Sequence, residues 1–295
     1  MPNWNEVRRE IDSVEAAGDA VRRKYLRLLH EHTGRNVIAY YSAFLSKPDL
    51  VGIEISDEDK NGFMTAVHGL DKAKGVDLLL HTPGGDIAAT QSIVHYLQSI
   101  FGTNMRAVVP QIAMSAGTMI ACSCREIVLG KQSNLGPIDP HLAGVPAYGV
   151  LDEFDRAVEQ CKEDPGKLAI WREIIGKYHP TFLGQCEQAI DWANAFVKDQ
   201  LTRVMFGGEE NAAARAAEVV EAFSNYWDNK THARHIHAEE CRKHGLKVTM
   251  MEDDPLFQDL VLTVHHCYMQ ALMNTRILKG FENHQGGALF RFQVG

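Results

Sequence analysis

The sequence predicts an α/β fold with a parallel sheet, because short apolar runs alternate with helical segments. The runs Val76–His81, Met105–Pro110 and Glu126–Leu129 have the length and apolar character of parallel strands covered on both faces. Two segments of helical pattern, Asp86–Phe101 and Met114–Cys124, separate them. This alternation predicts neighbouring parallel strands joined by right-handed crossovers.

Length, composition and charge limit the kind of protein. The chain has 295 residues, enough for one large α/β domain with an appendage. Hydrophobic residues make up 45% and charged residues 23%, a balance typical of a folded chain and not of a disordered one. The formal net charge is −8, whereas sequence-independent nucleic-acid binding needs a basic surface. We therefore expect no nucleic-acid partner.

Cysteine usage and apolar stretches bear on location. The chain has six cysteines and no CxxC pair, which predicts free thiols in a reducing compartment. Residues 1–32 are charged throughout and contain no apolar stretch of the signal-peptide type. The stretch Ala107–Cys124 is interrupted by Pro110 and Gln111, so we interpret it as a strand and a helix in series. These features predict a soluble, cytoplasmic protein with no membrane partner.

Periodicity and breakers predict the elements before the first apolar run. Apolar residues at helical spacing indicate a solvent-facing helix or helix pair over residues 5–32, with Gly34 as its stop. Asn36–Leu45 is rich in β-branched and aromatic residues and predicts a buried strand. Ser56, followed by three acidic residues, predicts a helix start and a helix to about Leu70.

From Tyr148 onward the pattern is mainly helical. The predicted helices span residues 149–162, 167–177, 182–204, 209–226 and 256–278. Trp171 and Trp192 lie on helical faces, where packing is their expected role. Residues 283–295 are expected to form an extended arm.

The first candidate for chemistry is the turn Thr82-Pro83-Gly84-Gly85 between a predicted strand and a predicted helix. Glycines there allow positive φ angles and a close approach of backbone N–H groups to a ligand. Such donors can stabilise an oxyanion. A plain strand-to-helix turn explains the same four residues equally well.

The second candidate is Ser115 in Ala113-Met114-Ser115-Ala116-Gly117-Thr118, which follows a strand and opens a helix. Ligands of open α/β sheets bind at this carboxyl end of a strand. Small neighbours admit a substrate, and the N–H of Ala116 is a second candidate oxyanion donor. For an isolated serine, a helix cap is the more common explanation. The G-x-S-x-G elbow is absent, because Ala113 stands where its first glycine would be.

Taken together, the turn, the Ser115 segment and Leu135-Gly136-Pro137-Ile138-Asp139-Pro140 resemble the Clp/crotonase superfamily of serine peptidases. Within it, the chain is most similar to the serine dehydrogenase proteinase family, relatives of signal peptide peptidase A and of the Clp proteolytic subunit. The resemblance is strong over residues 76–142 and weaker to Val248. It implies a Clp/crotonase-like fold of repeated ββα/βαβ units with additional C-terminal helices.

The resemblance also implies a function and a site. Ser115 would attack a peptide carbonyl, and the N–H groups of Gly84 or Gly85 and of Ala116 would form the oxyanion hole. The chain would divide into an N-terminal helical segment (1–35), a catalytic core (36–148), a mainly helical part that completes the site (149–282) and the arm (283–295).

The identity of the general base stays open between several residues. In Clp subunits a histidine follows the serine closely, but Ile138-Asp139 occupies that place here. The Ser–Asp–His order of the serine dehydrogenase proteinases implies Asp139 as the orienting carboxylate and His232 as the base. A carboxylate suits a histidine base better than a lysine, because it keeps a lysine protonated. The alternative bases are His141, His179 and Lys177.

The resemblance further implies a homo-oligomer that acts on peptides or unfolded proteins. No ATPase motif is present, so any activator or unfolding partner would be a separate protein. We expect no cofactor and no metal, since the histidines between Thr231 and His244 lack zinc-site spacing. Two other functions stay open: an acyl-CoA enzyme of the crotonase branch, which needs no serine at position 115, and a non-catalytic scaffold.

Overall fold

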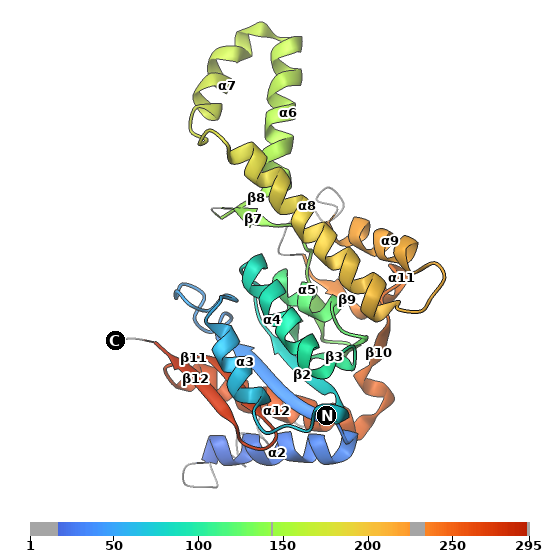
Figure 1. The fold of residues 1–295 in the computed structure, drawn as a ribbon. Helices are drawn as coiled ribbons and strands as arrows, with labels where there is room; N and C mark the ends of the chain where they lie inside the picture. The colour runs from blue at the N-terminus through green and yellow to red at the C-terminus, as the bar shows by residue number, and fades with distance from the viewer. Residues whose placement is uncertain (1–16, 143, 225–233, 294–295) are drawn as a thin grey trace.

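The computed structural model describes residues 17–142, 144–224 and 234–293, and a seven-stranded sheet runs through its lower half (Figure 1). The strand order is β10 (Val248–Met250), β5 (Glu126–Leu129), β3 (Met105–Val109), β2 (Val76–His81), β1 (Asn36–Ser42), β11 (Ile277–Asn283) and β12 (Ala288–Phe292). The first five strands are mutually parallel, and β11 and β12 are antiparallel to their neighbours. The predicted α/β class is therefore confirmed, and the three apolar runs are the adjacent strands β2, β3 and β5.

Alternation along the buried strands separates two cores. In β1, Ile38 and Tyr40 belong to the core beneath one layer of helices, whereas Val37, Ala39 and Tyr41 belong to the core on the opposite face. The first layer contains α3 (Asp59–Val67), α4 (Ile87–Phe101), α5 (Ala116–Cys122), α8 (Phe182–Gln200) and α9 (Ala212–Ser224). The second contains α2 (Ala17–Thr33) and α12 (Pro255–Asn274). The central strands β1, β2, β3 and β5 are buried on both faces, which explains their nearly continuous apolar sequences.

Three consecutive helices, α6 to α8, form an arm that projects from the sheet. Figure 1 shows α6 (Ala147–Glu163) and α7 (Leu168–Ile175) extending away from the sheet, and α8 returning toward it. A separate small core joins α6 to α8 and contains Ala147, Val150, Cys186 and Ile190. The chain continues through a π-helical turn (Leu201–Met205) into α9, and later through α11 (Ala238–Lys243). The predicted helices 149–162, 167–177 and 182–204 correspond to this arm.

The C-terminal region differs from the prediction. The last helix ends at Asn274 and not near residue 278, and residues 277–283 form β11, which pairs antiparallel with β1. Within the expected extended arm of residues 283–295, residues 288–292 form β12, which pairs with β11. Both strands complete the edge of the sheet beside β1. The expected N-terminal helix is α2 from residue 17, and residues 1–16 lie outside the described part.

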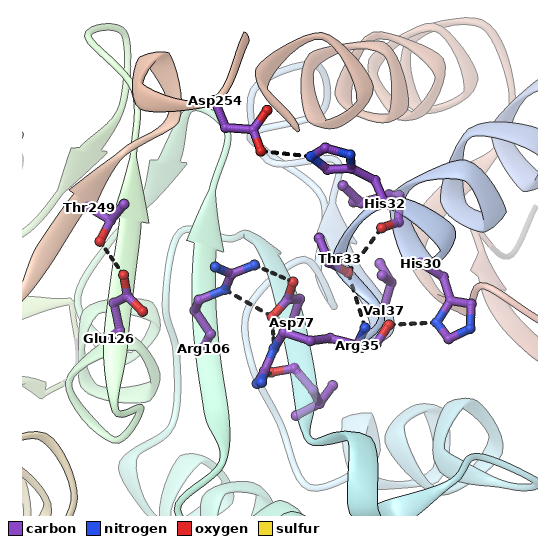
Figure 2. A network of polar contacts seen from close by, with 12 residues as sticks. His30, His32, Thr33, Arg35, Val37, Asp77, Arg106, Glu126, Thr249 and Asp254 are labelled. Atoms are coloured by element: carbon purple, nitrogen blue, oxygen red, sulfur yellow. Dashed lines mark hydrogen bonds and ion pairs between the residues drawn. The ribbon is translucent and has the colours of Figure 1, made fainter. Parts of the chain in front are cut away.

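A polar network closes the amino-terminal ends of β1, β2 and β3 (Figure 2). Asp77 of β2 is fully buried, and its carboxylate accepts hydrogen bonds from Arg35 Nε at 2.6 Å and from Arg106 Nη2 at 2.6 Å. Two guanidinium groups thus compensate the burial of one carboxylate. The apolar run that predicts β2 gave no indication of this ion pair.

Two further findings concern the helices and the cysteines. None of the helices in the described ranges is long and apolar enough to cross a membrane. All six cysteines are free thiols, and five of them are buried. Burial raises the pKa of Cys122 and of Cys124 to about 12, so these two thiols stay protonated near neutral pH.

Candidate active site

The glycine turn lies between β2 and α4 and touches the Ser115 segment. Gly84 has φ +99°, and a Cβ there would lie 2.7 Å from the carbonyl oxygen of Met114, 2.8 Å from Ser115 Cβ and 2.9 Å from the nitrogen of Ala116. Only glycine permits both this backbone angle and this approach. The two segments that the sequence singles out are therefore in direct contact.

Backbone pairing produces this contact. The Thr82 N–H donates to the carbonyl of Ile112 at 3.2 Å, and the Met114 N–H donates to the carbonyl of Thr82 at 3.0 Å. These bonds join the end of β2 to β4 (Ile112–Ala113), the short strand that precedes Ser115. The glycine turn and Ser115 are consequently the adjoining ends of two paired segments.

Ser115 itself has a strained backbone. Its φ is +49° and its ψ is −115°, and it shares a positive φ with only one other non-glycine residue in the described ranges, Thr181. Its side chain makes no helix-cap hydrogen bond, although the residue stands at the N-cap of α5. Strain of this kind is concentrated at functional sites. The helix-cap explanation of Ser115 therefore loses its support.

Two backbone donors beside Ser115 are available to a ligand. Within the described residues, neither the N–H of Gly85 nor that of Ala116 donates to a backbone carbonyl. The N–H of Gly84, by contrast, donates to the hydroxyl of Thr82 at 3.2 Å. Of the two glycines, only Gly84 thus has an N–H that donates to another described residue, and the N–H of Gly85 is free to donate to a ligand.

A cavity of about 560 Å³ opens onto these groups. It is lined by Glu54, Pro83, Gly84, Gly85, Asp86, Ile87, Ser115, Met119, Ile138, Pro140, His141, Leu142, Gly144, Ala189 and Trp192. One part of its wall comes from the hairpin of β7 (His141–Leu142) and β8 (Val145–Pro146) and from α8, which follow the Ser115 segment in the sequence. Its size is within the range of ligand-binding clefts.

Trp192 has a different place from the one expected. It is 45% exposed, it lines the cavity, and its Nε1 donates to Gln91 Oε1 at 2.9 Å. Helical periodicity alone suggested packing, because the period does not say which surface the helix faces. The sequence pattern assigned no role in a cavity to Trp192 or Met119. For Trp192, the available signal was a single tryptophan on an otherwise polar helix face.

The segment that carries Asp139 is tied to α5. Thr118 Oγ1 donates toward the carbonyl oxygens of Ala113 and Gly136, both at 2.9 Å, and accepts the N–H of Gly136 at 3.0 Å. In addition, β6 (Asn134–Leu135) pairs with β4. Residues 134–138 are thereby held beside the strand that leads to Ser115.

Asp139 and His141 lie next to each other in this region. Asp139 Oδ2 is 4.0 Å from His141 Nε2; the Asp139 side chain is almost fully buried, and one third of the His141 side chain is exposed. His141 also lines the cavity that Ser115 lines. Ser115, the two glycines and one of the alternative bases, His141, therefore line one cavity, and Asp139 lies beside His141 without being one of the lining residues.

Two of the other base candidates, Lys177 and His179, lie away from the cavity. Lys177 and His179 are exposed residues of the α7–α8 connection and do not line the cavity. His232 lies outside the described residues. The described residues on either side of it contact the Asp139 segment, since the carbonyl of Phe223 accepts the Ile138 N–H at 3.0 Å and Ile236 of β9 (Ile236–His237) pairs with Leu135.

The described residues contain no cluster of three or more His, Cys, Asp or Glu side chains arranged to hold a metal ion. The chemistry that the cavity offers is that of a serine hydroxyl, backbone N–H donors, carboxylates and imidazole.

Comparison with known proteins identifies the fold class and the family. The layered sheet and helices belong to the class of ClpP-like α/β proteins. A family model described as ClpP-like SDH-type serine proteinase matches residues 14–276, and the chain belongs to this family. The resemblance that the motifs suggest is therefore confirmed at the level of the family.

Individual relatives add less detail. Two uncharacterized proteins of Methanocaldococcus jannaschii, MJ0137 and MJ1495, are 32% identical over 196 residues and 28% identical over 148 residues. These matches cover 66% and 48% of this chain, and the chain spans 60% and 50% of the two relatives. Among solved structures, a mutant of the 1510-N membrane-bound stomatin-specific protease aligns with a TM-score of 0.41 and 17% identity, over 70% of this chain and 79% of that one.

Proposed function

We propose that the chain hydrolyses peptide bonds with Ser115 as the nucleophile. One observation carries the proposal: a strained, uncapped serine abuts a glycine turn, with two unused backbone N–H donors beside it. This is the geometry needed to bind the oxyanion of a tetrahedral intermediate. Family membership supplies the reaction class.

The proposed reaction proceeds through an acyl-enzyme. Ser115 Oγ attacks the carbonyl carbon of the scissile bond while the base takes the hydroxyl proton. The N–H groups of Gly85 and Ala116 stabilise the negative oxygen. The base then returns the proton to the departing amine as the C–N bond breaks, and a water molecule, deprotonated in the same way, hydrolyses the ester.

A histidine oriented by Asp139 is the proposed base. His141 is favoured among the described residues, because it lines the cavity with Ser115 and lies 4.0 Å from Asp139. The order of residues in the family implies His232 as the base, and this choice stays a prediction. It is supported by the contacts that Phe223 and Ile236, on either side of it in the sequence, make with the segment that leads to Asp139. Peptides or unfolded proteins as substrates, a homo-oligomer and a separate activator also stay predictions.

Replacement of Ser115 by alanine tests the proposal. We expect the variant to lose labelling by a fluorophosphonate probe and to hydrolyse fluorescein-labelled casein at least about 10⁴-fold more slowly, as when a triad nucleophile is deleted. The melting temperature should change little, since one oxygen is removed. The matched control is Ser99→Ala on the exposed face of α4, which should behave like the wild type.

Other outcomes would identify the alternatives. Casein hydrolysis that survives in Ser115→Ala would rule out this nucleophile. An absence of labelling and hydrolysis in the wild-type protein would favour the scaffold. Turnover of an acyl-CoA thioester that is insensitive to Ser115→Ala would favour the crotonase-type enzyme.

A further inference from the structure

The segment of residues 53–56, which we call the brace, runs along the glycine turn. The Ile55 N–H donates to the carbonyl of Gly84 at 2.7 Å, and the Asp86 N–H donates to the carbonyl of Ile55 at 3.0 Å. A Cβ on Gly85 would lie 2.4 Å from backbone atoms of Ile55. The brace therefore holds the turn on both sides of Gly85 and requires glycine there.

This contact fixes the direction of the Gly85 N–H. In a planar trans peptide, the C=O and the N–H of the same unit point in opposite directions. The carbonyl of Gly84 points to Ile55, so the N–H of Gly85 points away from the brace. A shift of the brace would turn this peptide and misdirect the donor.

Two side chains from the sheet hold the brace in turn. Ser42 Oγ donates to the carbonyl of Ile53 at 2.5 Å, and Lys279 Nζ donates to the carbonyl of Glu54. Ser42 and Lys279 are register partners on the paired strands β1 and β11. Consecutive carbonyls of the brace are thus held by neighbouring residues of the sheet.

Lys279 is an unusual residue for a strand of this kind. Its side chain is fully buried, and its ammonium lies 2.7 Å from Asp59 Oδ2, which also accepts the Tyr40 hydroxyl at 2.8 Å and the Ser56 N–H at 3.2 Å. A buried ammonium is tolerated only when it is paired and hydrogen-bonded. Lys279 donates a hydrogen bond to the carbonyl of Glu54, and Asp59 accepts one from the N–H of Ser56, so both residues of the pair bind the brace.

We propose that Lys279, paired with Asp59, is a positioning residue of the peptidase: it fixes the brace and thereby directs the Gly85 N–H toward the substrate oxygen. The proposal rests on the proposed function of Ser115 and Gly85. It assigns a role in catalysis to the C-terminal hairpin, which contributes no residue to the lining of the cavity.

The test replaces the buried pair by neutral groups of similar size, in Lys279→Met/Asp59→Asn. The matched control is Arg22→Met/Glu282→Gln, which removes another fully buried ion pair of β11 that makes no contact with the brace. We expect the test variant to lower kcat for labelled casein about 10-fold to 100-fold, as a misplaced oxyanion donor would, with KM within about threefold. Fluorophosphonate labelling of Ser115 should slow to a similar extent.

Several outcomes separate the possibilities. An unchanged kcat in a folded test variant, or an equal loss in the control, would overturn the positioning role while leaving the proposed function intact. Full activity of Ser115→Ala would overturn both. If circular dichroism shows that the test variant does not fold, Ser42→Ala takes its place: it removes one hydroxyl, and we expect kcat to fall about threefold to tenfold. An unchanged kcat in Ser42→Ala would then reject the proposal.

Discussion

At the scale of single residues, Ser115 and Gly84 show how backbone conformation prepares the site. A φ of +49° is an unfavourable conformation for a serine. It persists at Ser115 because the hydrogen-bonded segments on either side hold the backbone in place. Gly84 belongs to the same arrangement, since any side chain there would collide with Met114, Ser115 and Ala116. The proposed active centre thus needs both the Ser115 side chain and the absence of a side chain at position 84.

Gly84→Ala tests that dependence. The new Cβ would lie within 3 Å of the Ala116 nitrogen, so we expect kcat/KM for labelled casein to fall about 10²-fold or more, as when an oxyanion donor is lost. The control is Gly102→Ala, which also has positive φ, +60°, but no atom within 4 Å of the new Cβ. It should lose about 1 kcal/mol of stability and keep its activity. If Gly84→Ala and Gly102→Ala have equal kcat/KM, the glycine turn has a structural role only.

The base is the second question at this scale. If His141 is the base, His141→Ala should lower kcat at least about 10⁴-fold, as deletion of a triad member does, and His232→Ala should have a small effect. A histidine base gives a limb of the pH–rate profile near pH 6–7, because imidazole has an ordinary pKa of about 6.5. The opposite ranking of the two variants would establish His232 instead. A limb at higher pH that disappears in Lys177→Met would identify a lysine base.

At the scale of elements, β2 carries a buried imidazole directly before the glycine turn. The ring of His81 is fully buried and lies between Phe44 at 4.9 Å, His265 at 5.4 Å and Tyr41 at 5.4 Å between ring centroids. Burial lowers the pKa of His81 to about 3. The strand therefore needs this histidine to be neutral.

A pH dependence of stability follows. The unfolded chain binds a proton at His81 below about pH 6.5, whereas the folded chain does not bind it until about pH 3, so stability falls as the pH falls through this window. Between pH 7.5 and 5.5 this one group should lower the free energy of unfolding by about 1.4 kcal/mol.

Urea unfolding of His81→Phe at both pH values measures the effect. The loss of stability between the two pH values should shrink by that amount relative to the wild type. In His68→Phe, an exposed position, the loss should match the wild type. An identical loss in His81→Phe and the wild type would show that His81 does not titrate as inferred.

At the scale of the whole molecule, the C-terminal hairpin closes the sheet. β11 covers the edge of β1, and its residues Lys279 and Glu282 form fully buried ion pairs with Asp59 and Arg22. Truncation after residue 275 would leave both partners buried without their counter-charges, which is strongly destabilising. We expect this protein to lack a cooperative thermal transition in circular dichroism.

A shorter truncation provides the comparison. A chain that ends at residue 283 keeps β11 and both ion pairs and loses β12, so it should fold with a reduced melting temperature. If the truncation after residue 275 melts cooperatively near the wild-type temperature, the hairpin is an appendage and does not complete the sheet.

The sequence by itself determined the elements whose signals are local. The extents of β2, β3 and β5 follow from apolar runs, and the glycine turn and Ser115 stand out by residue type at strand ends. Strand length, helical period and the conformational freedom of glycine act over a few residues, so they can be read without a partner. The family could be inferred from the same motifs.

Only the tertiary structure decided which distant residues meet. Asp59 reads in the sequence as an acid in the first turn of a helix, yet it is buried against Lys279, 220 positions away. The contact of His141 with the Ser115 cavity, the position of Trp192 in its wall and the pairing of β11 with β1 are of the same kind. No local pattern encodes these contacts, because each depends on how the fold brings separate segments together. For the ion pair, burial is the physical reason: a charge that is removed from water must have a partner of opposite charge.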